Sequence, residues 1–199
     1  MSEILDAIAA MNLVEIIGTI FGFYAVVLMI RQHILCWPIG IANAALYTIM
    51  FYQNRLYSDM ILHICYILLF AYGWYEWLHG GENKGELKIS QTTTTEYIIC
   101  LILAVTGVFG LGFYFNNYTD ADLAYWDAGT TVFSLIAQWM LAKKLIENWI
   151  LWFIIDVVAS VLYVYKGLYW TATLFFLYLI LAVIGYLEWQ KQIQVINER

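Results

Sequence analysis

The chain has 199 residues, of which 63% are hydrophobic and 12% are charged, and its formal net charge is -6. Ordinary globular domains contain about 45–50% apolar and about 25% charged residues, so this composition excludes a soluble domain and indicates an integral membrane protein. The acidic residues are scattered rather than gathered in a tail, so the charge says little about partners and makes nucleic acid an unlikely one.

Apolar stretches long enough to cross a bilayer follow one another along almost the whole chain. Residues 1–12 precede them as a short lead-in, without the basic region and separate apolar core of a cleavable signal. We predict seven membrane-spanning helices, with approximate bounds Leu13 to Ile30, Ile34 to Gln53, Asp59 to Trp77, Tyr97 to Phe115, Tyr125 to Ala142, Asn148 to Tyr165, and Leu168 to Glu188.

The first three spans align with the last three at a shift of 112 residues. The matches include Trp37 with Trp149 and Gly73 with Gly185, although an aromatic-rich chain produces some identities by chance. We predict two parallel three-helix repeats in a 3+1+3 arrangement, with a site between them near the midplane of the membrane. The segments are residues 13–78 and 125–190 for the repeats, 79–96 for a polar connection, 97–116 for a linker helix, and 191–199 for a cytoplasmic tail.

Basic residues near the ends of the spans predict the orientation in the membrane, because Lys and Arg accumulate on the cytoplasmic side. The side that holds the N-terminus receives only Arg55 and Lys166. We therefore expect an outer N-terminus and a cytoplasmic C-terminus. The basic residues of the opposite side are Arg31, Lys84, Lys88, Lys143, Lys144, Lys191 and Arg199.

The fifth span carries a polar stripe on one helical face. Asp127, Thr131, Ser134 and Gln138 follow one another at steps of 4, 3 and 4 residues. A polar group left unpaired in hydrocarbon costs several kcal/mol, so the stripe has to face something other than lipid. An internal path or pocket is the leading interpretation, although Thr131 and Ser134 also suit hydrogen bonds within or between helices.

The sixth span places Trp149, Trp152 and Asp156 on one face. A carboxylate within a span is costly and marks a functional position by default. Aromatic rings one turn from a carboxylate suit a flat, polar or cationic ring ligand. The second span offers a counterpart of this face, and two further candidates lie near span ends, where Trp and Tyr also serve as membrane-interface anchors. These candidates are Trp37, Asn43, Tyr47, Trp126 and Asn148.

Several motifs together resemble the PnuC family of vitamin transporters. They are the stretch from Trp37 to Tyr47, YGWYEW from Tyr72, YWDAGTT from Tyr125, ENWILW from Glu147 with Asp156 following, and KGLYWTA. The resemblance covers nearly the whole chain. It implies a fold similar to that of the SWEET sugar transporters, a homotrimer in the bacterial inner membrane, and uptake of nicotinamide riboside by facilitated diffusion, with trapping by a cytoplasmic kinase.

The resemblance leaves the substrate open, because close relatives carry thiamine, and both compounds contain a positively charged ring nitrogen. Proton coupling also stays open, since Glu15 and Asp127 place one acidic residue in each repeat. Two other classes of function are an intramembrane enzyme and a receptor that binds without conducting. No nucleophile with a partnered histidine supports an enzyme. Cys36, Cys65 and Cys100 lie far apart, so we expect no metal and no cofactor.

Overall fold

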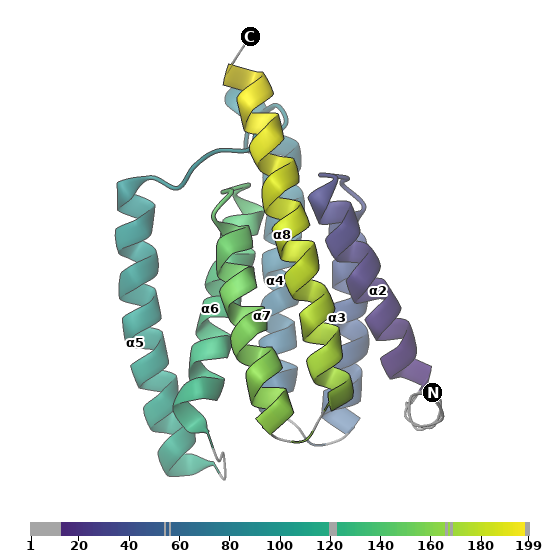
Figure 1. Cartoon of the computed structure of the whole chain (residues 1–199), viewed down its shortest axis with the longest axis vertical. Helices are drawn as coiled ribbons and strands as arrows, with labels where there is room; N and C mark the ends of the chain where they lie inside the picture. Colours follow the sequence, from purple (N-terminus) through teal and green to yellow (C-terminus); the bar gives the residue numbers. More distant parts are fainter. Residues whose placement is uncertain are drawn as a thin grey trace.

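The computed structural model describes residues 13–53, 55, 57–119, 123–165, 167 and 169–197, which form a helical bundle (Figure 1). The predicted lead-in over residues 1–12 lies outside the described residues, as do Lys166 and Arg199. The elements are α2 (Leu13–Ile30), α3 (Cys36–Gln53), α4 (Tyr57–His79), the 3-10 helix η1 (Glu82–Lys84), α5 (Thr94–Tyr118), α6 (Ala124–Ala142), α7 (Asn148–Tyr165) and α8 (Tyr169–Asn197).

Each predicted span is confirmed as one helix, and every end except that of α8 agrees with its predicted bound to within three residues. Two of the differences have identifiable reasons. Helix α5 begins at Thr94 rather than at Tyr97, because Thr93 and Glu96 form a capping box, in which the Glu96 amide donates to Thr93 Oγ1 over 3.3 Å. Helix α8 continues past Glu188 to Asn197, and the segment added contains no Gly or Pro to end it. Its Gln192 side chain accepts a hydrogen bond from the Gln32 amide group.

Four helices have the length and hydropathy of a membrane span on their own: α4 from Asp59, α5, α7, and α8 as far as Val195. Helix α2 contributes a shorter apolar stretch, Ile17–Ile30. Helices α3 and α6 have 18 and 19 residues, but polar side chains such as Asn43 and Gln138 lower their hydropathy. The chain is therefore a multi-pass membrane protein. The polar side chains of α3 and α6 are expected to face the interior of the bundle rather than lipid.

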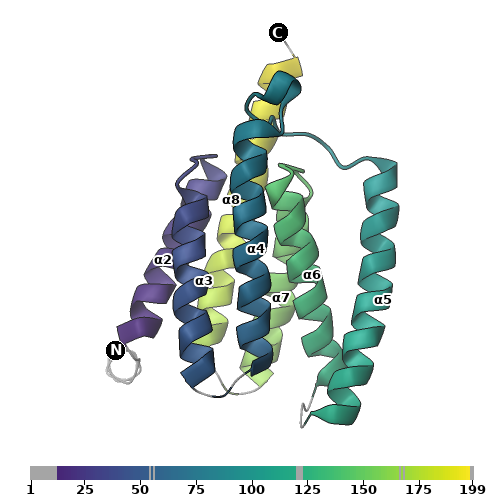
Figure 2. The ribbon, with the colours of Figure 1, turned by 180° about the vertical axis from the view of Figure 1, so that it is seen from behind.

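The helices pack as two groups of three, with α5 at the edge. Helix α3 packs between α2 and α4, and α7 packs between α6 and α8. The groups meet where α4 contacts α6 and where α2 contacts α8, whereas α5 packs mainly on α6 (Figures 1 and 2). The N-terminal start of α2 and the end of α8 lie at opposite ends of the bundle. We call these ends the N-terminal face and the C-terminal face.

The polar connection between α4 and α5 is attached to the C-terminal face. Ser90 exchanges backbone hydrogen bonds with the turn after α6, donating to Lys144 over 3.1 Å and accepting from Ile146 over 3.0 Å. The Thr92 hydroxyl donates to Glu147 Oε2 over 2.6 Å. These bonds fix the start of the segment that leads into α5.

Local features of the two groups recur at the spacing of 112 residues. Trp37 meets Trp77 edge to face with ring centroids 5.0 Å apart, and Trp149 meets Trp189 in the same way at 5.4 Å. A Cβ atom on Gly73 would overlap the Trp37 ring, and a Cβ atom on Gly185 would overlap the Trp149 ring. In each group a glycine therefore makes room for the indole that faces it.

The turns show the same correspondence as the tryptophans. Gln32 follows the end of α2 and Lys144 follows the end of α6, and both have φ of 52°. At the N-terminal face, Arg55 and Gly167 occupy equivalent turns with φ of 60° and 73°. Positive φ is uncommon outside glycine, so its recurrence at matching places indicates the same chain path in both groups.

Candidate functional site

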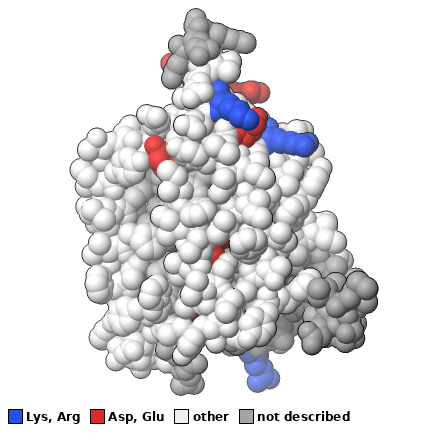
Figure 3. Space-filling model, in the orientation of Figure 1, with Lys and Arg blue, Asp and Glu red and all other residues white. Residues whose placement is uncertain are grey.

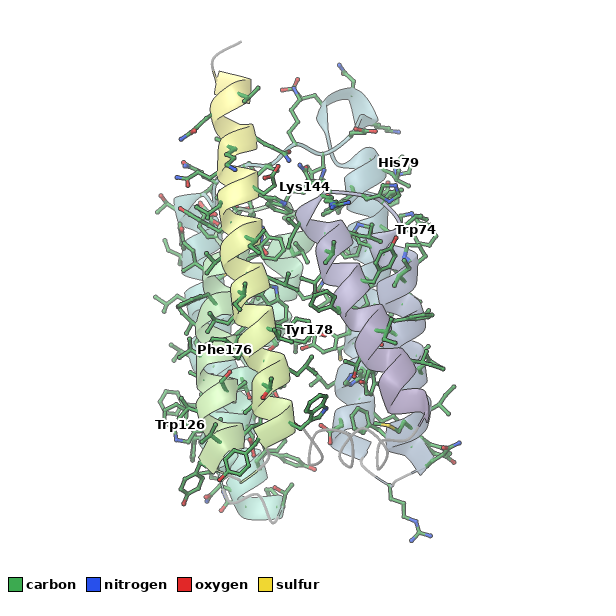
Figure 4. All side chains as sticks on the ribbon, turned by 45° about the vertical axis from the view of Figure 1, so that its right-hand side comes forward. Trp74, His79, Trp126, Lys144, Phe176 and Tyr178 are labelled. Carbon is green, nitrogen blue, oxygen red and sulfur yellow. The ribbon has the colours of Figure 1, made fainter. Side chains whose placement is uncertain are left out.

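A cavity of about 290 Å³ lies between the two groups of helices, and we call it the central cavity. Helices α2, α3 and α4 form one wall, and α6, α7 and α8 form the other. Tyr178 lies between α8 and α2 in Figure 4, and the bare backbone of Gly22 leaves room for its hydroxyl group. The polar side chains that line the cavity are Asn43, His63, Tyr66, Gln138, Asp156 and Tyr178.

Three buried polar atoms around the central cavity have no hydrogen-bond partner among the described residues. They are Asn43 Oδ1 on α3, Gln138 Nε2 on α6 and Trp149 Nε1 on α7. Buried polar groups in proteins are nearly always paired, and one left unpaired costs about 1–3 kcal/mol. Asn43, Gln138 and Trp149 all line one cavity, so a polar ligand bound there could pair these atoms.

Asp156 adds a carboxylate to this wall of the cavity, and its side chain is 4% exposed. Trp149 and Trp152 lie on the same helix one to two turns before it. Both indoles line the cavity. The arrangement combines flat aromatic surfaces with one acidic group, which suits an aromatic ring that carries a positive charge.

A second hollow, of about 620 Å³, lies toward the N-terminal face. The polar stripe of α6 connects the two spaces, because Asp127, Thr131 and Ser134 line the second hollow and Gln138 lines the central cavity. Phe175 borders both spaces. The stripe predicted from sequence thus faces internal spaces rather than lipid.

The predicted site residues fall into two sets. Those that line the central cavity are Asn43, Gln138, Trp149, Trp152 and Asp156, and Asp127 lines the second hollow. The other four, Trp37, Tyr47, Trp126 and Asn148, line neither of these two spaces.

Trp37 is fully buried against Gly73 and Trp77. Tyr47 packs over Gly18 and stacks on Phe51 at 5.9 Å. Asn148 is also fully buried, and its side-chain amide donates to the Leu145 carbonyl over 2.6 Å at the start of α7. Trp126 is 56% exposed and projects outward near the N-terminal face (Figure 4).

The structure also brings residues to the cavity that the polar stripes do not identify. Tyr66 and Tyr178 line it from the two groups of helices, and they match each other at the 112-residue shift. His63 and Phe175 form a second matched pair of lining residues. The repeat alignment pairs these positions, and it is the signal in the sequence that could have identified them.

Four tryptophans pack on one another at the C-terminal side of the central cavity, and Trp149 is the one of them that lines it. Beyond Trp149 lie Trp37, Trp77 and Trp189, each at most 3% exposed. Trp77 Nε1 donates to the Leu141 carbonyl over 3.3 Å, and Trp189 Nε1 donates to the Ile30 carbonyl over 3.1 Å. Each bond links one group of helices to the other at this face.

Basic residues gather on the C-terminal face, as Figure 3 shows around the end of α8. The Lys143 ammonium pairs with Glu76 over 3.3 Å. The Lys144 ammonium lies 4.4 Å from the centre of the Trp77 ring, and burial lowers the pKa of Lys144 to about 8. At the N-terminal face, the described part of the turn between α3 and α4 contributes one basic residue, Arg55.

Comparison with known proteins gives consistent matches. A family model described as nicotinamide mononucleotide transporter matches residues 12–191. The nicotinamide riboside transporter PnuC of Escherichia coli K12 is 28% identical over 182 residues, covering 78% of this chain and 76% of that protein. The riboflavin/roseoflavin transporter RibM of Streptomyces davaonensis is 23% identical, covering 88% and 83%.

Among solved structures, a crystal structure of the vitamin B3 transporter PnuC superposes with a TM-score of 0.69. It is 21% identical to this chain, and the match covers 89% of this chain and 80% of that one. The helical arrangement described above is therefore similar to one observed in a crystal.

Proposed function

This chain belongs to the nicotinamide mononucleotide transporter family, and we propose that it carries nicotinamide riboside across the membrane by facilitated diffusion. The proposal rests mainly on the central cavity, where the unpaired atoms of Asn43, Gln138 and Trp149 converge beside Asp156. In this proposal Trp149 and Trp152 stack on the pyridinium ring. The amide groups and the carboxylate bond its polar substituents.

The chemistry of the cavity favours the riboside over other compounds named in the family. Its acidic lining residue is Asp156, and no Lys or Arg lines it among the described residues. A mononucleotide would bring a phosphate close to this carboxylate without a cation to pair it. Riboflavin has no cationic ring for the carboxylate to attract. Thiamine shares the positive ring nitrogen and is the alternative substrate.

We propose that all seven helices cross the membrane in a 3+1+3 arrangement, with α5 as the linker. The repeated Trp pairs, the matching turns and the equivalent contacts of α4 with α6 and of α8 with α2 support two parallel repeats. The position of the cavity between the groups fits the location of sites in transporters built from repeats.

We further propose that the C-terminal face is cytoplasmic. Arg31, Lys143 and Lys144 lie at this end of the bundle, which supports the orientation because basic residues accumulate on the cytoplasmic side. The second hollow then opens toward the outside and precedes the central cavity on the way in. The family resemblance supports a homotrimer in the bacterial inner membrane, and the exposed apolar surface of α5 offers an interface.

Uptake into sealed proteoliposomes tests the proposed function. Labelled nicotinamide riboside should equilibrate across the membrane without ATP or an ion gradient. The label should accumulate above the outside concentration only when a riboside kinase and ATP are enclosed, because the kinase converts the riboside to the mononucleotide, and this would show the trapping step. Asp156→Asn should slow uptake, whereas Glu188→Gln, a change to a half-exposed acid on the C-terminal face, should not. Saturable binding without flux would indicate a receptor instead.

Competition separates the substrates. We expect unlabelled nicotinamide riboside to block uptake at lower concentrations than thiamine, and nicotinamide mononucleotide to block it least. A protein that takes up thiamine and ignores the riboside would contradict the substrate assignment and leave the carrier assignment in place. Uptake that stops when a proton gradient is collapsed would show coupling to protons.

A further inference from the structure

His63 on α4 lines the central cavity, and aromatic rings hold it in place. Its ring centroid lies 4.9 Å from that of Phe51, 5.5 Å from that of Tyr47 and 5.7 Å from that of Tyr66. Rings packed on several sides leave the imidazole little freedom to change its orientation. Any polar atom that it presents to the cavity is therefore held in a defined place.

A hydrogen bond to the backbone assigns the tautomer of this imidazole. Nδ1 of His63 lies 2.9 Å from the carbonyl oxygen of Asp59, one turn earlier in the helix. A carbonyl oxygen only accepts hydrogen bonds, so Nδ1 carries the hydrogen. In the neutral ring, Nε2 is then an acceptor. No described residue forms a hydrogen bond with Nε2.

The other repeat has a hydrocarbon ring at the equivalent position. Phe175 is 112 residues after His63 and also lines the central cavity. Its ring lies edge to face with Tyr178 at 6.4 Å, as the His63 ring does with Tyr66. A phenyl ring thus meets the packing requirement at this position, and the acceptor nitrogen of His63 is an addition that packing does not need.

The direction of the helices places His63 at the opposite end of the cavity from the tryptophans. Helix α7 starts at the C-terminal face and Trp149 is its second residue, whereas α4 starts at the N-terminal face and His63 lies in its second turn (Figure 2). A pyridinium ring stacked on Trp149 and Trp152 can be oriented with its N-linked substituent toward His63. In a riboside that substituent is the sugar, which carries hydroxyl donors.

We propose that Nε2 of His63 accepts a hydrogen bond from a ribose hydroxyl and so selects the riboside over the free base. This inference rests on the proposed function, because it takes a cationic nucleoside as the ligand of the central cavity. His63 then determines specificity at the sugar end, while Asp156 and the tryptophans recognise the ring.

Binding of two probes to the purified full-length protein tests the assignment. The first is nicotinamide riboside, and the second is 1-methylnicotinamide, which keeps the cationic carboxamide ring but has a methyl group in place of the sugar. We expect His63→Phe, which copies Phe175 of the other repeat, to raise the Kd for the riboside by about 3- to 10-fold, the range for one neutral hydrogen bond. The Kd for 1-methylnicotinamide should not change.

Two further variants control for packing and for loss of a histidine as such. His63→Gln restores an acceptor and should bind the riboside more tightly than His63→Phe. His79→Phe removes a histidine whose Nδ1 forms the same kind of bond, to the Tyr75 carbonyl over 3.2 Å, but which is exposed outside the cavity. It should bind both probes as the wild type does.

The outcomes separate this inference from the function on which it rests. Equal weakening of both probes in His63→Phe, or unchanged affinity for the riboside, would overturn the role of His63 and leave the carrier function intact. A wild-type protein that binds neither probe would overturn the proposed function, and the role of His63 with it.

Discussion

Trp189 on α8 donates its indole N–H to the carbonyl oxygen of Ile30, the last residue of α2, over 3.1 Å. The carbonyls of the last turn of a helix have no partner within the helix, so the indole satisfies one of them. Trp77 donates in the same way to the Leu141 carbonyl near the end of α6, which also accepts from the Lys144 amide over 3.0 Å. Each bond joins residues more than 60 positions apart in the chain and fixes one group of helices to the other.

Removal of the hydrogen bond from Trp189 to the Ile30 carbonyl gives the first prediction. Trp189→Phe keeps most of the ring but leaves the buried Ile30 carbonyl unpaired, so we expect the free energy of unfolding to fall by about 1–3 kcal/mol. Thermal unfolding in detergent measures the loss. Trp126→Phe changes an exposed tryptophan and should leave Tm nearly unchanged. Equal Tm values for the two variants would contradict the role of the bond.

Asp156→Asn tests the recognition of positive charge. The amide keeps the shape of the side chain but removes the negative charge, so we expect the Kd for nicotinamide riboside to rise by about 10- to 100-fold, the range for a charged hydrogen bond. Titration followed by tryptophan fluorescence measures the change. If Asp156→Asn binds the riboside with wild-type affinity, the positively charged ring is recognised at another position.

Trp149 and Trp152 should respond differently to truncation. Trp149 also packs against Gly185 and Trp189, so Trp149→Ala should lower the free energy of unfolding by about 3–5 kcal/mol in addition to removing binding. Trp152 is only half-buried, and Trp152→Ala should weaken binding with a much smaller loss of Tm. Calorimetric unfolding beside a binding titration distinguishes the two effects. The reverse order of Tm losses would contradict this packing.

Gly185→Ala tests the close approach of α8 to Trp149. The added Cβ would lie 2.6 Å from the indole ring, so we expect a loss of about 1–3 kcal/mol in stability and weaker riboside binding, because the ring has to shift. Gly129→Ala on α6 is the matched control, since nothing lies within 4 Å of a Cβ there. That variant should be neutral or slightly more stable. Similar stability and riboside binding in the two variants would contradict the close contact between Gly185 and the Trp149 ring.

Lys144 gives a pH-dependent prediction. Burial lowers its pKa to about 8, whereas an unfolded lysine titrates near about 10.4. Between these values the unfolded chain binds more protons than the folded one, so the free energy of unfolding should rise as the pH increases from about 8 to about 10. Lys144→Met should lack this part of the rise. Parallel Tm curves for wild type and variant across this range would show that Lys144 is not the source.

Helix positions and the polar stripe could be predicted from sequence because both depend on local spacing. The apolar stretches determine α2 to α8, and the steps from Asp127 to Gln138 determine one face of α6. The ends of α5 and α8 differed because a capping box and an uninterrupted polar helix lie outside the apolar signal.

The exact lining of the cavity could not be predicted, because it depends on packing between helices. Trp37 and Trp149 occupy equivalent positions and both meet a glycine, yet only Trp149 lines the central cavity. Asn148 is adjacent to a lining residue, but its amide group bonds the Leu145 carbonyl. Such differences arise from the asymmetry between two similar groups of helices, which the spacing of residues along one chain does not record.

Phe175 lies between the second hollow and the central cavity. The two ends of the proposed substrate route through the protein are therefore closed by different numbers of side chains. A change of rotamer at one side chain is a smaller rearrangement than a movement of whole helices, which takes microseconds to milliseconds. On the proposed route, entry past one phenyl ring needs a smaller rearrangement than exit past Trp149 and the tryptophans packed behind it. Release on the far side, rather than loading, is the step that would set the pace of a full cycle.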